Sequence, residues 1–400
     1  MVLRLPFRTA CRLCTLFIRE MAARVWLPSV WNEKKGTDEM TDKNMLLRPV
    51  WEGGQVFRET FAMVGDGEPC SAPFLLEPEK VIAIESYDKS CTFDLGKDCY
   101  VEDGRLVLTQ DSRMPHTGWN SFYYDSFEEA KEGQKSNAME LDFGPVATTD
   151  GKFLNLNAIG NPEMITRWQA AVTYETKEKW TGYRPVSRIA RLPRLYGKWK
   201  RKEKVRIVLY GDSISCGCDC SGLYGLEPKQ PQWSELLMES LQVFYGVPIE
   251  FINTSVGGVD TEWAIENAWE RAASYQPDLV LLGFGMNDRC AGEEYRKKTK
   301  RLMDRIREKA PETEFVLIAT SLPNPLSETE PHYFCAHQHE YARSLRLLCG
   351  QGVVLADVQG VQREVMKRKR YIDLTGNLLN HPNDYLARIQ AQVLDTVLKP

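Results

Sequence analysis

The chain reads Val205-Arg206-Ile207-Val208-Leu209-Tyr210 and then, without a break, Gly211-Asp212-Ser213-Ile214-Ser215. The first run is apolar enough for a buried strand, and the second has the glycine and polar residues of a tight turn. A strand-to-helix turn exposes a serine and holds it rigidly, which suits a nucleophile that a base must activate. Ser213 is therefore a candidate nucleophile, although a turn serine taken alone more often caps the following helix.

The sequence from residue 205 onward alternates strand-like and helix-like segments. Continuous apolar strands separated by amphipathic helices predict a parallel sheet with helices on both faces. The expected strands are Val205–Tyr210, Ile249–Asn253, Leu279–Gly283, Phe315–Thr320 and Val353–Asp357. The expected helices are Trp233–Phe244, Thr261–Ala273, Glu293–Lys309 and Glu340–Cys349. We therefore expect residues 205–400 to form an α/β domain with three layers, α/β/α.

Two further polar blocks each follow one of these strands. They are Asn253-Thr254-Ser255-Val256-Gly257-Gly258 and Gly285-Met286-Asn287-Asp288, and a fourth block, Asn380-His381-Pro382-Asn383-Asp384, lies far downstream. In an open parallel sheet, ligands bind at the carboxyl ends of the strands. The turn serine, the second glycine of the glycine pair and the asparagine are therefore expected to meet at one edge of the sheet.

The four blocks, in this order, resemble those of the SGNH/GDSL hydrolase superfamily, whose four named residues fall here on Ser213, Gly258, Asn287 and His381. The resemblance extends from about Lys204 to the C-terminus. It implies that Ser213 is the nucleophile and His381 the general base. It also implies that the backbone N–H groups of Ser213 and Gly258 and the side-chain amide of Asn287 bind the oxyanion, each such donor being typically worth about 2.7–4 kcal/mol.

One position departs from the pattern of the superfamily, which usually has an aspartate three residues before the histidine. Leu378 stands there instead. Asp373, Asp384 and Asn377 are nearby candidates for orienting His381, and a backbone carbonyl in that role would leave a Ser–His dyad. Losing the orienting carboxylate costs about 10⁴ in rate in a serine protease, so an active enzyme is expected to have a substitute.

The front half of the chain follows a different pattern. Residues 46–183 contain short alternating runs such as Arg105–Thr109, Ala138–Phe143 and Leu154–Ala158, with turn residues between them. This pattern is typical of antiparallel strands, and we expect an all-β, jelly-roll-like sandwich. The arrangement is similar to that of certain carbohydrate acetylesterases. Most of its aromatic residues are expected in the core, with a sugar-stacking surface as the alternative.

Two segments are expected to lie outside both domains. Residues 1–45 are rich in arginine but lack the apolar run of a secretory signal, so we expect a nonstructural leader. Met40 or Met45 would then be the natural start. Residues 184–204 combine basic residues with prolines, which predicts an exposed connector.

The composition narrows the functional classes. A hydrophobic share of 43% is that of a soluble globular protein, and a net charge of −4 argues against nucleic-acid binding. No run approaches the roughly 20 apolar residues of a membrane helix. Eleven cysteines in a long chain indicate a reducing, cytoplasmic compartment rather than a disulfide framework. The run Cys216-Gly217-Cys218-Asp219-Cys220 lacks the spacing of a zinc site, and no metal or other cofactor is expected.

These observations favour a serine esterase that removes small acyl groups, with acetyl the first choice, from a carbohydrate ester or a related small-molecule ester. One alternative is a lipase-like or thioester acylhydrolase, which would need an extended apolar groove. The other is a glycan-binding protein with an inactive hydrolase domain, suggested by Leu378 and by the aromatic front half. The sequence specifies no oligomeric state.

Overall fold

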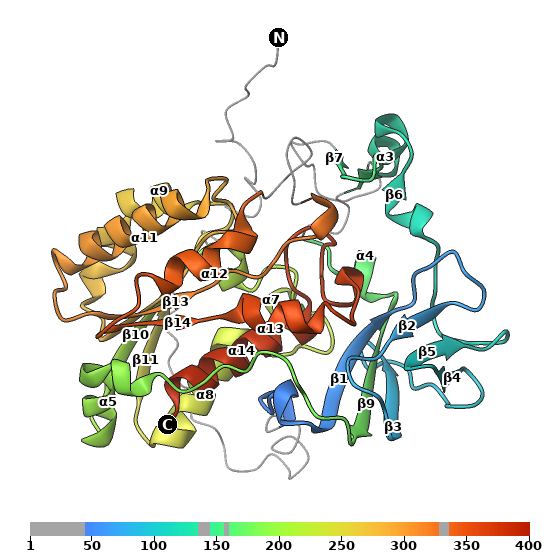
Figure 1. Cartoon of the computed structure of the whole chain (residues 1–400), viewed down its shortest axis with the longest axis horizontal. Coiled ribbons are helices and arrows are strands. Elements are labelled where there is room, and N and C mark those ends of the chain that lie inside the picture. Colours follow the sequence, from blue (N-terminus) through green and yellow to red (C-terminus); the bar gives the residue numbers. More distant parts are fainter. Residues whose placement is uncertain (1–44, 135–144, 156–159, 328–335) are drawn as a thin grey trace.

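The computed structural model describes residues 45–134, 145–155, 160–327 and 336–400. The predicted leader, apart from Met45, lies outside the described residues, and so does the alternating run Ala138–Phe143. Figure 1 shows two parts, a helix-covered sheet built from the second half of the chain and a β region built from the first half.

The C-terminal sheet has five parallel strands in the order β11-β10-β12-β13-β14. The strands are β10 (Val205–Gly211), β11 (Ile249–Asn253), β12 (Leu279–Gly283), β13 (Glu314–Ile318) and β14 (Val353–Ala356). All five were predicted, with ends within two residues of those observed. The order reverses direction at β10, and such a switch point opens a crevice at the carboxyl ends of the strands.

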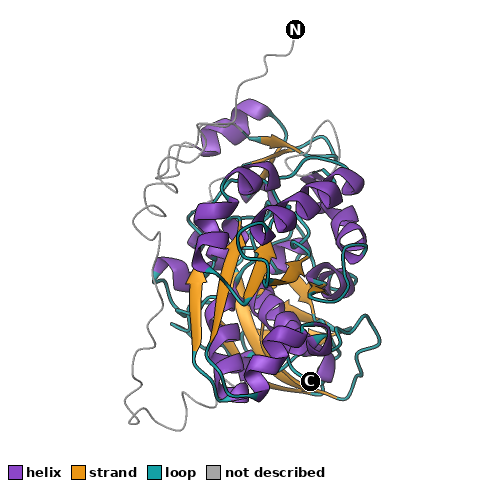
Figure 2. Ribbon diagram, turned by 90° about the vertical axis from the view of Figure 1, so that its left-hand side faces the viewer, coloured by secondary structure: helices purple, strands orange, loops and turns teal. Residues whose placement is uncertain are grey.

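Helices cover both faces of this sheet, as Figure 2 shows, which confirms the α/β/α architecture. The helices are α6 (Ser213–Cys216), α7 (Ser221–Tyr224), α8 (Trp233–Tyr245), α9 (Thr261–Glu266), α10 (Ala268–Arg271), α11 (Gly292–Arg307), α12 (Gln338–Arg346), α13 (Val358–Val365) and α14 (Asp384–Leu398). The helix predicted over residues 261–273 is divided at Asn267, whose φ of −103° is not helical.

Alternate residues of β10 face the two helical layers. Ile207 and Leu209 belong to an apolar cluster that includes residues of α8, α13 and α14. Val208 and Tyr210 belong to a second cluster, which includes residues of α9, α10, α11 and α12. Side chains along a strand point to opposite faces in turn, so a strand that is covered on both sides needs apolar residues at successive positions. This explains the uninterrupted apolar run from which the domain was predicted.

The β region consists of antiparallel strands, as predicted. They form three three-stranded sheets, in the orders β1-β9-β3, β2-β5-β4 and β6-β8-β7. The strands are β1 (Gly54–Ala62), β2 (Ser71–Pro73), β3 (Lys80–Ser86), β4 (Cys99–Glu102), β5 (Arg105–Leu108), β6 (Tyr123–Tyr124), β7 (Val146–Ala147), β8 (Phe153–Leu154) and β9 (Gln169–Thr176). Two helices, α3 (Phe127–Gln134) and α4 (Glu163–Thr166), accompany them.

The segment predicted as an exposed connector, residues 184–204, is only partly exposed. It contains helix α5 (Pro193–Lys200), which begins at a proline, a residue favoured in the first turn of a helix. Leu195 and Trp199 are buried, and the Trp199 ring stacks on Tyr245 at a centroid distance of 4.0 Å. The prediction weighed the basic residues and prolines but missed the apolar face between them.

A single apolar cluster runs through both parts of the protein. It contains Val56, Phe61 and Tyr174 of the β region together with Leu386 and Ile389 of α14. Thirteen of the residues of α14 are buried, so this helix is covered nearly all round. A helix of that kind belongs in the interior of a protein. The β region and the hydrolase-like domain therefore share one core.

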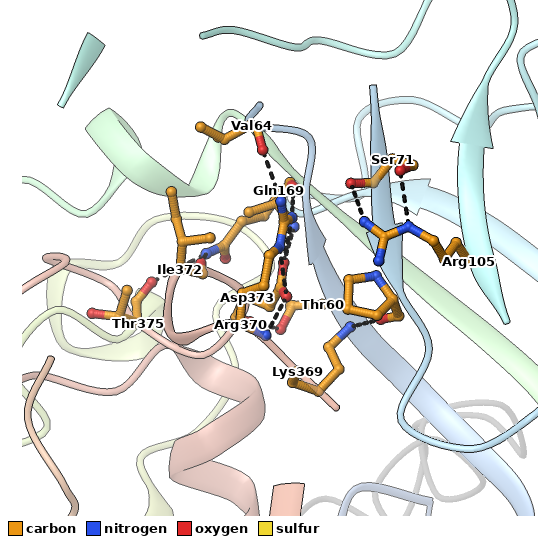
Figure 3. A network of polar contacts seen from close by, with 12 residues as sticks. Thr60, Val64, Ser71, Arg105, Gln169, Lys369, Arg370, Ile372, Asp373 and Thr375 are labelled. Carbon is orange, nitrogen blue, oxygen red and sulfur yellow. Dashed lines mark hydrogen bonds and ion pairs between the residues drawn. The ribbon is translucent and has the colours of Figure 1, made fainter. Parts of the chain in front are cut away.

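Polar contacts also join the two parts. Figure 3 shows some of them, such as the hydrogen bonds from Arg370 to the carbonyl of Val64 and from the hydroxyl of Thr60 to the carbonyl of Asp373. Lys369 and Glu59, both fully buried, form an ion pair with an N···O distance of 2.8 Å. The backbone N–H of Leu75 and the hydroxyl of Tyr174 donate to the two oxygens of Glu59. The ammonium of Lys369 also lies 3.6 Å from the centroid of the Phe61 ring. Burial raises the pKa of Glu59, and the charge of Lys369 opposes that rise.

Removing one partner of this pair should destabilise the protein strongly. We expect Lys369→Met to lower the free energy of unfolding by about 3–5 kcal/mol, because it leaves the Glu59 carboxylate buried and unpaired. Urea denaturation monitored by circular dichroism measures the change. The double variant Glu59→Gln/Lys369→Met should be more stable than Lys369→Met alone. A loss below about 1 kcal/mol in the single variant would contradict the expectation.

Candidate active site

Ser213 lies directly after β10, at the first position of the short helix α6. The turn is tight: a Cβ on Gly211 would lie 2.2 Å from Oγ of Ser215 and 2.5 Å from the carbonyl oxygen of Gly283. Only glycine fits there. Asp212 caps α6, since its Oδ1 accepts the N–H of Ile214 at 3.0 Å. The cap of this helix is therefore Asp212, which leaves the Ser213 hydroxyl for another contact.

That contact is made with His381. The Oγ of Ser213 lies 2.8 Å from Nε2 of His381, although 168 residues separate them in sequence. Both residues are more than nine-tenths buried. The loop that carries His381 is folded around Asn377, whose Oδ1 accepts the N–H groups of Leu379, Asn380 and His381, each at 3.0 Å. Asn377, one of the candidates for orienting the ring, thus shapes the loop instead.

Asp219 is the residue that contacts the other ring nitrogen. Its Oδ2 lies 2.5 Å from Nδ1 of His381, and its side chain is fully buried. It sits between α6 and α7, in the left-handed region with φ of +62°. A carboxylate at this place favours the tautomer with the proton on Nδ1, which leaves Nε2 free to accept the proton of Ser213. The contacts thus run from the Ser213 hydroxyl through the His381 ring to the Asp219 carboxylate, a geometry in which a serine can act as nucleophile, a histidine as base and a carboxylate as orienting acid.

The two acids expected near His381 have other partners. Asp384 accepts the backbone N–H of Ser221 at 2.9 Å and its hydroxyl at 2.6 Å, which fixes the start of α7 just after Asp219. Burial raises the pKa of Asp384. Asp373 accepts the N–H of Ala62 in β1 at 2.8 Å and pairs with Arg370. The expectation that one of them orients the imidazole is therefore corrected in favour of Asp219.

The sequence did hold one signal for this acid. Asp219 is the only carboxylate between Asp212 and Glu227, and it follows the candidate nucleophile by six residues. The usual pattern of the superfamily places the acid three residues before the histidine, so the sequence pointed to acids near His381. Closeness to the candidate serine in sequence would have identified Asp219.

The block after β12 is tied to the loop that contains Gly258. The side-chain amide of Asn287 donates to the carbonyl of Val259 at 3.0 Å, and Asp212 Oδ2 accepts the N–H of Met286 at 3.3 Å. Gly258 has φ of +75°, and no atom lies within 4 Å of a Cβ built on it. The structure thus brings Ser213, Gly258 and Asn287 to the same edge of the sheet, as expected from their positions after successive strands.

Gln338 of α12 supports the same block from behind. Its buried side-chain amide donates to the carbonyl oxygens of Gly285, Met286 and Asp288, at distances of 2.9–3.1 Å. The hydroxyl of Tyr341 donates to the carbonyl of Asp288 at 2.6 Å. These contacts fix the backbone on both sides of Asn287. No sequence pattern singled out either residue.

Asp212 gives the site a pH-dependent contribution to stability. Burial raises the pKa of this carboxyl to about 7, against the hydrogen bonds from Ile214 and Met286 that lower it. A carboxyl group whose pKa is higher in the folded than in the unfolded chain favours folding while it is protonated. That stabilisation is present below the unfolded pKa of 3.8 and is lost as the pH rises through about 7.

An Asp212→Asn variant removes this titration. Between about pH 4 and pH 7, the free energy of unfolding should fall less steeply with pH in the variant than in the wild type, whatever the absolute stability of each. Urea denaturation at a series of pH values measures both slopes. Equal slopes would show that Asp212 carries no raised pKa.

Three cysteines follow Ser213 closely in the sequence. Cys216, Cys218 and Cys220 are buried thiols outside any disulfide, and the Sγ of Cys220 lies 3.5 Å from the carbonyl oxygen of Pro382. Within the described residues, no group of three His, Cys, Asp or Glu side chains could hold a metal ion. Within the same residues, no helix is both long enough and apolar enough to cross a membrane.

Comparison with known proteins identifies the domain that carries this site. Residues 209–389 match the model of the GDSL-like lipase/acylhydrolase family. This part of the chain is therefore a GDSL-like domain. The resemblance seen in the four sequence blocks is confirmed, and the family places the GDSL domain among the carboxylic ester hydrolases. No curated protein matches the chain in sequence.

Several solved structures are similar to the GDSL domain. A two-domain esterase active on acetylated mannans is 20% identical, with a TM-score of 0.42 over 55% of this chain and 57% of the esterase. An acetylxylan esterase from Geobacillus stearothermophilus is 17% identical, with a TM-score of 0.39 over 48% of this chain and 92% of that one. A putative GDSL-like lipase from Parabacteroides merdae is 19% identical, with a TM-score of 0.38 over 49% and 96%.

The arrangement around His381 in the GDSL domain can be tested with three aspartate variants. We expect Asp219→Asn to lower kcat by about 10⁴, the loss seen when a serine protease loses this carboxylate. Asparagine tolerates a positive φ, so the change removes the charge without straining the backbone. Asp373→Asn and Asp384→Asn should each lower kcat by less than Ser213→Ala does. Rates of p-nitrophenyl acetate hydrolysis by folded variants measure all four.

Proposed function

We propose that the protein is a serine esterase that removes small acyl groups, acetyl foremost, from a carbohydrate ester. The observation that carries the proposal is the contiguous set of contacts from Ser213 through His381 to Asp219, within a GDSL acylhydrolase domain. Nucleophile, base and orienting acid are all groups of the protein, so the reaction needs no cofactor.

In the proposed reaction, Oγ of Ser213 attacks the ester carbonyl carbon while Nε2 of His381 takes the hydroxyl proton. Asp219 stabilises the imidazolium that forms. The negative charge on the carbonyl oxygen is bound by the N–H groups of Ser213 and Gly258 and by the amide of Asn287. The bond to the alcohol then breaks, and His381 returns the proton to the leaving oxygen. Water, activated by the same histidine, releases the acid from the serine.

The burial of the site supports a short acyl group. Ser213 and His381 are 6% and 9% exposed. Ile214 and Met286, each adjacent in sequence to a proposed site residue, pack together as a small buried apolar pair. A long acyl chain would have to displace these side chains, whereas a methyl group needs little space. This argument favours an acetylesterase over a lipase-like enzyme.

Aromatic side chains next to the histidine loop support a carbohydrate as the alcohol. Trp119, Tyr123 and Trp168 are half-buried and pack against a cluster that contains Leu378 and Leu379. Aromatic rings of this kind present an apolar face together with a polar edge, and sugar rings stack on such surfaces. The alternative of an inactive, glycan-binding protein was suggested by Leu378. It loses that support because Asp219 contacts His381.

Active-site labelling and product analysis test the proposal together. A fluorophosphonate probe should label the wild type and not Ser213→Ala, and acetylated oligosaccharides should release acetate only with the wild type. On p-nitrophenyl esters, kcat/KM should fall as the acyl chain lengthens beyond a few carbons. Labelling with a preference for chains of eight or more carbons would favour the lipase-like alternative. Glycan binding without labelling would contradict the proposed esterase activity.

A further inference from the structure

The second oxygen of Asp219 is bound by the β region. While Oδ2 contacts His381, Oδ1 accepts the backbone N–H of Gly160 at 2.8 Å. Gly160 lies between β8 and α4, so it belongs to the other part of the protein, 59 residues before Asp219. The hydroxyl of Tyr224, 3.3 Å from Oδ1, is a second and longer contact.

This contact fixes the orientation of the carboxylate. A single hydrogen bond from His381 would leave the Asp219 carboxylate free to turn about its Cβ–Cγ bond. A second donor on the other oxygen defines its plane. The backbone around Asp219 is also fixed, since the carbonyl oxygen of Asp219 would lie 2.2 Å from a Cβ placed on Gly376. Hydrogen bonds to a charged acceptor are stronger than those between neutral groups, so Gly160 is well suited to this task.

The position that usually supplies the acid has a different use in this chain. Leu378 is buried with φ of +64° and belongs to an apolar cluster with Ala62, Val64 and Phe122 of the β region. The carbonyl of Leu378 also accepts the side-chain amide of Asn324 at 2.8 Å, and that amide donates to the hydroxyl of Tyr123 as well. The residue at the position of the usual acid thus packs on the β region.

We propose that the β region contributes to the active site. The backbone N–H of Gly160 is a positioning group that holds the Asp219 carboxylate in line with the His381 ring. The inference rests on the proposed function, since it assigns the contact to the same reaction. It gives the β region a role in the rate of hydrolysis in addition to any role in binding the alcohol part of the substrate.

The test is a Gly160→Ala variant with a matched control. Gly160 has φ of +71°, so alanine there is strained and shifts the N–H. Gly151 lies in the turn before β8 with φ of +84°, so Gly151→Ala carries a similar backbone strain. No atom lies within 4 Å of a Cβ built on Gly151, and this residue makes no contact with Asp219. We expect Gly160→Ala to lower kcat for p-nitrophenyl acetate about tenfold, equivalent to about 1.4 kcal/mol, with KM little changed. Gly151→Ala should stay within about twofold of the wild type.

A double-variant cycle separates positioning from general damage. If Gly160 acts through Asp219, then Gly160→Ala should have no further effect in the Asp219→Asn background. Equal tenfold losses in both backgrounds would overturn the inference, and so would a loss below twofold in the wild-type background. The proposed function would survive either result, because it depends on labelling of Ser213. Absence of Ser213 labelling in the wild type would instead contradict the proposed function.

A second measurement needs no change at Gly160. In protein labelled with ¹⁵N-glycine, the amide proton of Gly160 should resonate downfield in the wild type and move upfield in Asp219→Asn, because a neutral amide is a weaker acceptor than a carboxylate. The amide of Gly151 should not move. An unchanged Gly160 resonance would show that its N–H does not bind Asp219, and the inference would fall even if Gly160→Ala did not fold.

Discussion

The loop that carries His381 depends on a strand pair from the other end of the chain. Asp373, which precedes the loop, accepts the N–H of Ala62 in β1, and Gln169 in β9 donates to the carbonyls of Ile372 and Thr375. Asn383, at the end of the loop, donates to Gln169 as well. Buried backbone groups need such partners, because water does not reach them. The distance between Ser213 and His381 is therefore set by the docking of β1 and β9 on this segment.

The position of the orienting acid illustrates how little a catalytic arrangement depends on sequence order. Triads with the same geometry occur on unrelated folds with their members in different orders. Here the carboxylate comes from the loop after the nucleophile, and the position before the histidine is free to become apolar. Leu378 then packs against the β region. From the sequence alone Leu378 suggested an inactive enzyme, but in the structure it makes an apolar contact between the two parts of the protein.

The elements that local pattern determines were predicted well. The five strands of the sheet were found because strands covered on both faces must be apolar at successive positions, and Ser213 and His381 because their neighbouring residues resemble a family. Gly160 and Gln338 could not be found in this way, since their roles depend on contacts with residues 53 to 59 positions away. Asp219 lies 162 residues before the histidine that it contacts, and its only signal in the sequence was its closeness to Ser213. The helix in the predicted connector was missed for a different reason. Its apolar residues, Leu195 and Trp199 among them, are few and are surrounded by basic ones.

The hydrogen bond from the N–H of Ala62 to the carboxylate of Asp373 joins residues that are 311 positions apart in sequence. At a synthesis rate of 5–20 residues per second, β1 leaves the ribosome roughly 15–60 s before the segment on which it docks. During that interval Glu59 lacks the ammonium of Lys369, although Leu75 and Tyr174, which also bind Glu59, are made well before it. Until then the N–H of Ala62 lacks its carboxylate partner, so this end of β1 is a place where another chain could pair.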